Sequence, residues 1–208
     1  VETGRRHRGT AQAMHVPTRT MPGVVVLAGD LGGTKILLEL SRCEGGSLEV
    51  LFGRRYAAAQ YAGLESVLRA FLDEFSASGA LPPGIDRACF GVAGPVAEER
   101  AKLTNLPWTI DAAELAHRFG ICSVQLVNDF AAAAHGIDEL RPEALVTLQA
   151  GEPVDRGTRA ILGAGTGYGA AYSIWTDAGS KSVICKRTLP PSSRSTSVMT
   201  VGGSGDGK

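Results

Sequence analysis

Residues 24–40 read VVVLAGDLGGTKILLEL, and this stretch decides the fold. Val24–Ala28 is rich in β-branched residues, Gly29–Gly33 is rich in glycine, and Thr34–Leu40 is again mostly apolar. β-Branched residues favour strands, and adjacent glycines favour a tight turn. The stretch therefore predicts two antiparallel strands joined by a Gly-Gly turn.

Beyond this pair of strands, the hydrophobic pattern predicts further strands and helices. A third strand is expected over Leu48–Tyr56, and apolar residues at helical spacing predict a helix over Tyr61–Phe75. The other expected elements are strands at Arg87–Val92, Cys122–Val127, Arg159–Leu162 and Gly169–Trp175 and helices at Ala112–Phe119 and Phe130–Gly136. Asp111 is the expected N-cap of the helix that starts at Ala112, and Gly120 is its expected end. This order predicts an α/β fold, with a mixed sheet and helices on both faces.

The overall charge and composition argue against several classes of protein. The chain has 21 Lys and Arg and 21 Asp and Glu, so its formal net charge is zero and supplies no positive field that would attract nucleic acid. No apolar run approaches the roughly 20 residues that cross a bilayer. The four cysteines form no CxxC pair, and Cys89 and Cys122, which lie in apolar runs, are expected to be buried. We therefore expect a cytoplasmic protein with neither nucleic acid nor a membrane as a partner.

The two ends of the chain differ in composition from the middle. Residues 1–20 carry a net charge of +3 and residues 181–208 one of +4, which leaves −7 for the residues between them. Residues 186–208 are mostly Ser, Gly, Thr and Pro, so they cannot bury enough apolar surface to offset the entropy of ordering. Both ends are therefore expected to be disordered.

The glycine-rich turn is a candidate phosphate site. Its residues are Gly29, Asp30, Leu31, Gly32, Gly33 and Thr34. Glycines let backbone N–H groups approach phosphate oxygens, and a carboxylate such as Asp30 can hold Mg²⁺ through water. The Walker pattern GxxxxGK[ST] is not present. A plain hairpin with a Gly-Gly turn explains these residues about equally well.

A second candidate site is formed by Asn128 and Asp129. The strand expected at Cys122–Val127 ends there, at the edge of the sheet where open α/β proteins bind ligands. A carboxylate in that place can accept a proton from an attacking hydroxyl, which the Asn can orient. Asn and Asp are also favoured helix N-caps, and the local sequence by itself favours the cap.

A third candidate is the segment of residues 163–169, which reads GAGTGYG. The backbone N–H groups of Gly165, Thr166 and Gly167 could reach a ligand, together with the Thr hydroxyl. A dinucleotide fingerprint would need a helix next, but the residues that follow resemble a strand. The pattern therefore favours a second phosphate-binding hairpin.

Asn105 is a fourth candidate, in a turn just before Trp108. Its amide could hydrogen-bond a sugar hydroxyl while the indole ring packs nearby. A turn-forming Asn beside a core Trp is the commoner arrangement.

In this order, the four motifs resemble those of bacterial glucokinases, within the actin/hexokinase/Hsp70 ATPase superfamily. The resemblance runs from about Val24 to Trp175 and depends on the combination, since each motif alone is weak. It implies an RNase-H-like fold in two lobes, with glucose and Mg·ATP in the cleft between them. The implied reaction transfers the γ-phosphate of ATP to the 6-hydroxyl of glucose and gives glucose 6-phosphate and ADP, as in the first step of glycolysis.

The resemblance also implies a role for each candidate residue. Asp129 would be the catalytic base that takes the proton from the sugar. The residues that would hold sugar hydroxyls are Asn105, Asn128 and Asp129. Gly29–Thr34 and Gly165–Gly167 would surround the ATP phosphates, with the carboxylate of the first loop near Mg²⁺. A homodimer is a possible assembly, because it is the usual one in the family.

One part of the family pattern is missing. In the family a Glu-Gly-Gly-His segment that contacts the sugar follows the second phosphate loop, whereas this chain has no Glu after Glu152 and no His after His135. We therefore expect a truncated or frame-shifted product whose second lobe is incomplete. Its expected parts are an N-terminal extension at 1–20, a first lobe at 21–155, the start of a second lobe at 156–180 and an unrelated tail at 181–208. A catalytically inactive fragment, with weak sugar or nucleotide binding at most, is the alternative to an active glucokinase.

Overall fold

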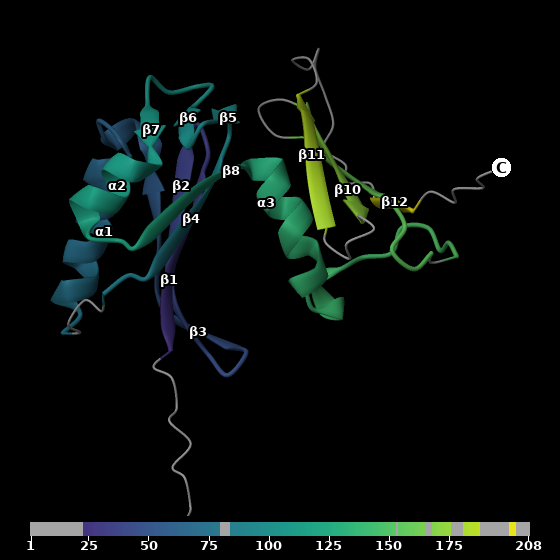
Figure 1. Ribbon diagram of the computed structural model, residues 1–208, viewed down its shortest axis with the longest axis horizontal. Helices are drawn as coiled ribbons and strands as arrows, with labels where there is room; N and C mark the ends of the chain where they lie inside the picture. Colours follow the sequence, from purple (N-terminus) through teal and green to yellow (C-terminus); the bar gives the residue numbers. More distant parts are fainter. Residues whose placement is uncertain are drawn as a thin grey trace, which may run out of the picture.

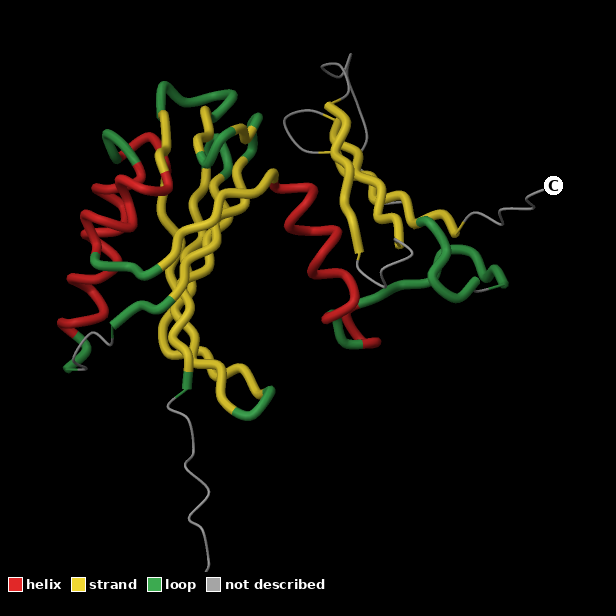
Figure 2. The backbone as a smooth tube through the Cα atoms, viewed as in Figure 1, coloured by secondary structure: helices red, strands yellow, loops and turns green. Residues whose placement is uncertain are grey.

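The computed structural model describes residues 23–79, 84–152, 154–164, 168–175, 181–187 and 200–202 of the chain. Its main helices are α1 (Leu64–Ala77), α2 (Ala112–Phe119) and α3 (Asp129–Gly136). Figure 1 shows a five-stranded sheet with α1 and α2 on one side and α3 on the other, and a second sheet beyond α3. Figure 2 shows the same arrangement, with α3 in red between two groups of yellow strands. The expected α/β fold, with a mixed sheet and helices on both faces, is confirmed.

The predicted hairpin forms the centre of the five-stranded sheet. Strand β1 (Val24–Leu31) pairs antiparallel with β2 (Lys35–Glu44), and the turn between them is closed by a hydrogen bond from the Gly32 N–H to the Lys35 carbonyl, 3.0 Å long. Strand β3 (Ser47–Ala57) adds to the other side of β2 and lies at the edge of the sheet. All three strands are longer than the sequence predicts, because cross-strand pairing extends them beyond the apolar runs.

Two parallel strands complete this sheet on the other side of β1. Strand β4 (Arg87–Val92) pairs with β1, and β8 (Ser123–Asn128) pairs with β4. The sheet order is therefore β3-β2-β1-β4-β8. Because β1, β4 and β8 run in the same direction, their carboxyl ends lie at one edge of the sheet.

The core of this lobe lies between the sheet and helices α1 and α2. Phe71 and Leu68 of α1 are fully buried against apolar strand residues such as Leu27 and Phe90. Helix α2 begins as predicted, since the carboxylate of Asp111 accepts a hydrogen bond from the Glu114 N–H, and it ends at Gly120, which has a left-handed φ of 64°. The amphipathic pattern of the sequence is sufficient to place both helices on the sheet.

Three short strands between β4 and α2 are absent from the sequence prediction. They are β5 (Val96–Ala97), β6 (Arg100–Lys102) and β7 (Thr109–Asp111), and they form a small antiparallel sheet. Strands of two or three residues are too short for a hydrophobic period to be recognised. The chain also contains short 3₁₀ turns at Ala58–Gln60, Ile137–Glu139 and Pro142–Ala144.

The second sheet lies on the far side of α3 (Figure 1) and is antiparallel throughout. Its order is β11-β10-β9-β12, formed by β9 (Arg159–Ala164), β10 (Tyr168–Trp175), β11 (Lys181–Arg187) and β12 (Thr200–Gly202). The sequence predicts β9 and β10, but it places residues 181–208 in a disordered tail. Strands β11 and β12 show that this expectation is wrong for their residues, since β10 and β9 offer edges with which they pair. The rest of that range lies outside the described residues, as do residues 1–20.

The cysteine expectation is also corrected. Cys122 is exposed and Cys89 is only partly buried. Cys122 stands between the buried Ile121 and the first residue of β8, and its side chain points away from the core that Ile121 enters. None of the helices in the part of the chain described here is long and apolar enough to span a membrane.

Candidate active site

The site lies at the edge of the sheet where β1, β4 and β8 end. Asp30 of β1 is paired with Gly91 of β4, and Asn128 ends β8 beside Val92. Because α3 begins directly after Asn128, Asp129 is brought to the same edge. The register therefore gathers the first and second sequence candidates into one place.

A pocket of about 410 Å³ occupies this edge of the sheet. Its lining residues come from β1, β4 and α3, and they are Gly29, Asp30, Gly91, Asp129, Phe130, Ala132 and Ala133. Apart from the two carboxylates and the Phe130 ring, these side chains are small. The pocket thus holds two acids in surroundings that leave room for a ligand.

Asn128 has a double role in this geometry. Its Oδ1 accepts a hydrogen bond from the Phe130 N–H at 3.0 Å, and its Nδ2 donates to the Gly94 carbonyl at 3.2 Å. The N-cap interpretation of Asn128 is therefore confirmed. Capping does not exclude ligand contact, because each of the two amide atoms can make a further hydrogen bond. The two bonds fix the orientation of the amide directly beside Asp129.

Asp129 is held by the start of its own helix. Its Oδ1 accepts a hydrogen bond from the Phe130 N–H at 2.9 Å. Burial raises the pKa of Asp129 above the ordinary value of 3.8, and the negative charge of Asp30 raises it further, while the bond from Phe130 opposes both effects. A carboxylate with a raised pKa is a stronger base than an ordinary Asp, as a proton acceptor requires.

Asp30 is the other acid of the pocket. Its side chain remains exposed on the open side, and the desolvation by surrounding protein raises its pKa above 3.8. No cluster of three or more His, Cys, Asp or Glu is present in the described ranges, so the protein alone offers few ligands to a metal ion. Mg²⁺ suits such a place, because it retains several waters and binds through one or two carboxylates and substrate phosphates.

The first glycine loop divides into structural and accessible residues. A Cβ at Gly29 would lie 2.5 Å from Cδ1 of Phe90, and the side chain of Leu31 is fully buried, so core packing accounts for both residues. The Gly32 N–H is used by the turn itself. The N–H groups of Gly33 and Thr34 have no hydrogen-bond partner among the described residues. Within this loop, those two amides are the ones available to a phosphate.

Asn105 lies against the same loop. A Cβ added to Gly33 would be 2.8 Å from Cβ of Asn105 and 3.1 Å from its Nδ2, so glycine is required for this approach. The Asn105 side chain is exposed, whereas Trp108 is buried in the core. The turn thus contains a core Trp, as in the common arrangement of a turn-forming Asn beside a buried Trp. It also brings the exposed amide of Asn105 beside the glycine loop.

Gly165, Thr166 and Gly167 of the second glycine loop lie outside the described residues. Its two flanking residues, Ala164 and Tyr168, are paired at the ends of β9 and β10. The loop therefore connects the two strands of a hairpin, and α3 contacts both of those strands.

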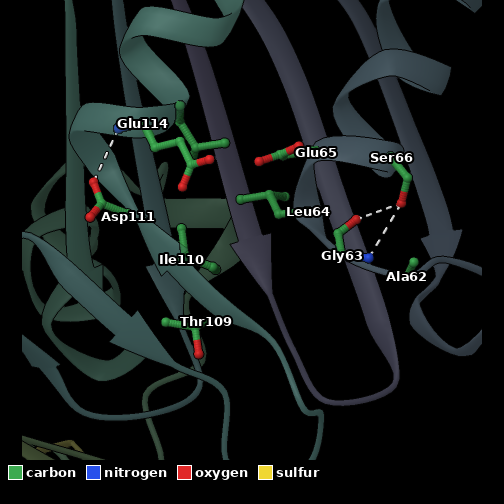
Figure 3. A pocket seen from close by; sticks show the side chains of 10 residues that line it. Ala62, Gly63, Leu64, Glu65, Ser66, Thr109, Ile110, Asp111 and Glu114 are labelled. Atoms are coloured by element: carbon green, nitrogen blue, oxygen red, sulfur yellow. Dashed lines mark hydrogen bonds between the residues drawn. The ribbon is translucent and has the colours of Figure 1, made fainter.

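A second pocket, of about 300 Å³, lies where α1 and α2 begin (Figure 3). Its polar groups serve the helix ends: the Asp111 carboxylate caps α2, and the Ser66 hydroxyl donates to the Gly63 carbonyl at 2.7 Å. Glu65 and Glu114 pair with Arg118. None of the four sequence motifs contributes a ligand-facing residue here, so we assign this pocket a structural role.

Several lining residues of the pocket at the sheet edge are missing from the sequence prediction. Gly91 faces α3, where a Cβ would lie 3.3 Å from Cβ of Ala132, and Phe130 fills one side of the pocket. The available signals were a glycine inside a buried strand and a run of four alanines in a short helix. Neither pattern indicates a ligand without the sheet register.

Known proteins resemble this chain in sequence. The glucokinase family model matches residues 27–192. The glucokinase of Nostoc punctiforme is 38% identical over 151 residues, which are 72% of this chain and 43% of that protein. The glucokinase of a Synechocystis species is 41% identical over 158 residues, covering 73% and 44% of the two chains. The chain thus spans less than half the length of these curated relatives.

Solved structures give the same result. The crystal structure of a glucokinase from an Antarctic psychrotroph superposes with a TM-score of 0.66 at 27% identity, covering 78% of this chain and 49% of that one. A glucokinase from Balamuthia mandrillaris in complex with glucose shares the fold, with a TM-score of 0.54 at 21% identity. The family match includes residues 181–192, which are the first part of the tail at 181–208 that the sequence predicts to be unrelated to the family. From the motifs, the fold and these matches together, the chain belongs to the glucokinase family.

Proposed function

We propose that this chain acts in the transfer of the γ-phosphate of ATP to the 6-hydroxyl of glucose. The observation that carries the proposal is the convergence of Asp30 and Asp129 on one pocket at the carboxyl edge of the sheet, in a member of the glucokinase family. Two acids of raised pKa in a pocket lined by small side chains suit a sugar hydroxyl and a phosphate-bound cation.

Asp129 is the proposed proton acceptor. Its Oδ1 is engaged with the Phe130 N–H, so its Oδ2 would accept the proton from the sugar 6-hydroxyl. Asn128, whose amide is fixed by two hydrogen bonds, would hold a neighbouring hydroxyl. Asn105 would hold another from the other side of the glycine loop. Since phosphoryl transfer depends mainly on positioning and charge, these bonds orient the attacking oxygen.

The phosphates would be bound by backbone amides. Gly33 and Thr34 would donate their N–H groups, and Gly165–Gly167 would form the facing loop. Asp30 would hold Mg²⁺ through water, and the ion would neutralise charge on the ATP phosphates. We extend the proposal to a cytoplasmic location, where exposed thiols such as Cys43 and Cys122 stay reduced, and to a homodimer, by resemblance to the family.

The direct test is glucose-dependent release of ADP from Mg·ATP by the purified chain. Asp129→Asn should abolish the release, because an amide cannot accept the proton. Asp73→Asn is the matched control, since Asp73 is an exposed carboxylate on α1, outside the pocket, and its rate should equal that of the parent. Equal rates for Asp129→Asn and the parent would refute the role of Asp129.

The second candidate is an inactive family member with weak binding at most. It is favoured by the residues given after the second glycine loop, which contain neither Glu nor His. Calorimetric titration with glucose and with Mg·ATP separates the two proposals. An inactive chain should release no ADP and show no effect of one ligand on the affinity for the other.

A further inference from the structure

Phe130 links the start of α3 to the second sheet. The residue directly follows Asp129, and its ring lies against two glycines, Gly163 of β9 and Gly169 of β10. These glycines are directly opposite each other in the antiparallel register. The ring therefore rests on one cross-strand pair.

The contact is possible only because both residues lack a side chain. A Cβ at Gly163 would lie 2.8 Å from Cε1 of the Phe130 ring and 3.0 Å from its Cζ. A Cβ at Gly169 would overlap Cε2, Cζ and Cδ2 of the same ring. The ring occupies the space of two missing Cβ atoms, so its position and that of the hairpin determine each other.

The backbone of Phe130 is anchored on the other side. Its N–H donates to Oδ1 of Asn128 at 3.0 Å and to Oδ1 of Asp129 at 2.9 Å. Phe130 thus contacts Asn128 and Asp129 through its backbone N–H, and it contacts the β9–β10 hairpin through its ring. Gly163 and Gly169 directly adjoin Ala164, the last residue of β9, and Tyr168, the first residue of β10.

We propose that Phe130 is a positioning residue that fixes the β9–β10 hairpin, the carrier of the proposed second phosphate loop, relative to Asp129. The inference rests on the proposed function, since it concerns the distance between the proton acceptor and the phosphate. Sliding of the β9–β10 hairpin along α3 would change the distance between the hairpin and Asp129. The contact of the Phe130 ring with Gly163 and Gly169 prevents this sliding. Phe130 acts through Asp129 and the hairpin and takes no part in the chemistry itself.

The test measures how strongly one ligand affects the affinity for the other. The affinity of the chain for glucose is measured by calorimetry with and without a saturating non-hydrolysable ATP analogue and Mg²⁺, in the parent and in Phe130→Leu. The parent should bind glucose at least about fivefold more tightly when the analogue is present. Phe130→Leu should lose most of this coupling, because Leu fills volume but cannot span both glycines.

A second pair of variants keeps the test decisive if Phe130→Leu folds poorly. Gly169→Ala should weaken binding of the analogue about tenfold or more, and adding Phe130→Ala should recover much of that loss, because the added methyl then has the space of the ring. Gly136→Ala is the control on α3, since a Cβ there meets open space, and it should behave as the parent does.

The outcomes distinguish the inference from the proposed function. If the parent binds neither glucose nor the analogue, the proposed function fails, and the inference fails with it. If the parent shows coupling and Phe130→Leu retains it in full, the inference alone is overturned. Equal losses for Gly169→Ala with and without Phe130→Ala would also overturn it.

Discussion

Asp30 and Asp129 line one pocket together with Gly91, and the charge of Asp30 raises the pKa of Asp129. The two acids are nearly a hundred residues apart in the chain, on β1 and at the start of α3. They meet because β4 lies between β1 and β8 and all three strands run in parallel. Their mutual repulsion is relieved when one of them is protonated, which makes the site responsive to pH.

The first prediction concerns the titration of Asp129. Asp30→Asn removes the neighbouring charge, so the pKa of Asp129 should fall, although burial still keeps it above 3.8. Carboxyl carbon shifts in an NMR pH titration report the change directly, without any need for activity. Asp73→Asn, on α1, should leave the titration of Asp129 unchanged. An unchanged pKa in Asp30→Asn would show that the two carboxylates do not interact.

The second prediction concerns stability and its dependence on pH. The folded state raises the pKa of Asp129, so the protonated form favours folding. This contribution is complete below the unfolded pKa near 3.8 and is lost as the pH rises through the folded pKa. Asp129→Asn is neutral and can still accept the bond from the Phe130 N–H, so it should melt at a higher temperature than the parent at pH 7. The advantage should disappear near pH 3. Calorimetric melting of both proteins at pH 7 and pH 3 checks this prediction. A melting temperature of Asp129→Asn below that of the parent at pH 7 would contradict it.

The third prediction separates core packing from phosphate binding at the first loop. Gly29→Ala should reduce the free energy of unfolding by about 1–3 kcal/mol, because the new methyl overlaps the Phe90 ring. Urea unfolding measures the loss. Gly53→Ala on β3 is the control, since its Cβ would be 3.8 Å from the nearest atom, the Leu38 carbonyl oxygen. If Gly29→Ala binds nucleotide more weakly but keeps the free energy of unfolding of the parent, Gly29 is required for ligand binding and not for core packing.

The fourth prediction concerns sugar binding by Asn105. Its amide is exposed beside Gly33, so Asn105→Ala should weaken glucose binding about tenfold, as expected for the loss of one hydrogen bond. The affinity for the ATP analogue should be unchanged, which makes nucleotide binding the internal control. Calorimetry measures both. Equal weakening of the two ligands would indicate that Asn105 supports the glycine loop instead.

Most of the first sheet could be predicted from the sequence. The run from Val24 to Leu40 encodes its own hairpin, because β-branched residues and paired glycines act over a few neighbours. Asp111 and Gly120 mark the ends of α2 for the same reason, as caps depend on adjacent backbone groups. The short strands β5 to β7 and the strands β11 and β12 could not be predicted in this way, since pairing partners distant in the chain stabilise them.

The residues of the candidate site also differ in whether a local sequence pattern marks them. Residues such as Asp30 and Asn128 are marked by local patterns, and the order of those patterns identifies the family. Phe130 is not marked, because an apolar residue at the start of a helix has no distinctive signal. Its role follows from Gly163 and Gly169, whose opposition across two strands depends on register.

The sequence by itself determined the fold class, the family and the residues that carry acid, amide and glycine chemistry, because these follow from residue type and short spacing. Only the tertiary structure decided which of them meet. The parallel register of β1, β4 and β8 places Asp30 and Asp129 on one pocket, and the space left by two glycines seats Phe130 between that pocket and the hairpin. The physical reason is that packing and strand pairing set the distances between residues remote in the chain, whereas a local sequence pattern depends only on neighbouring residues.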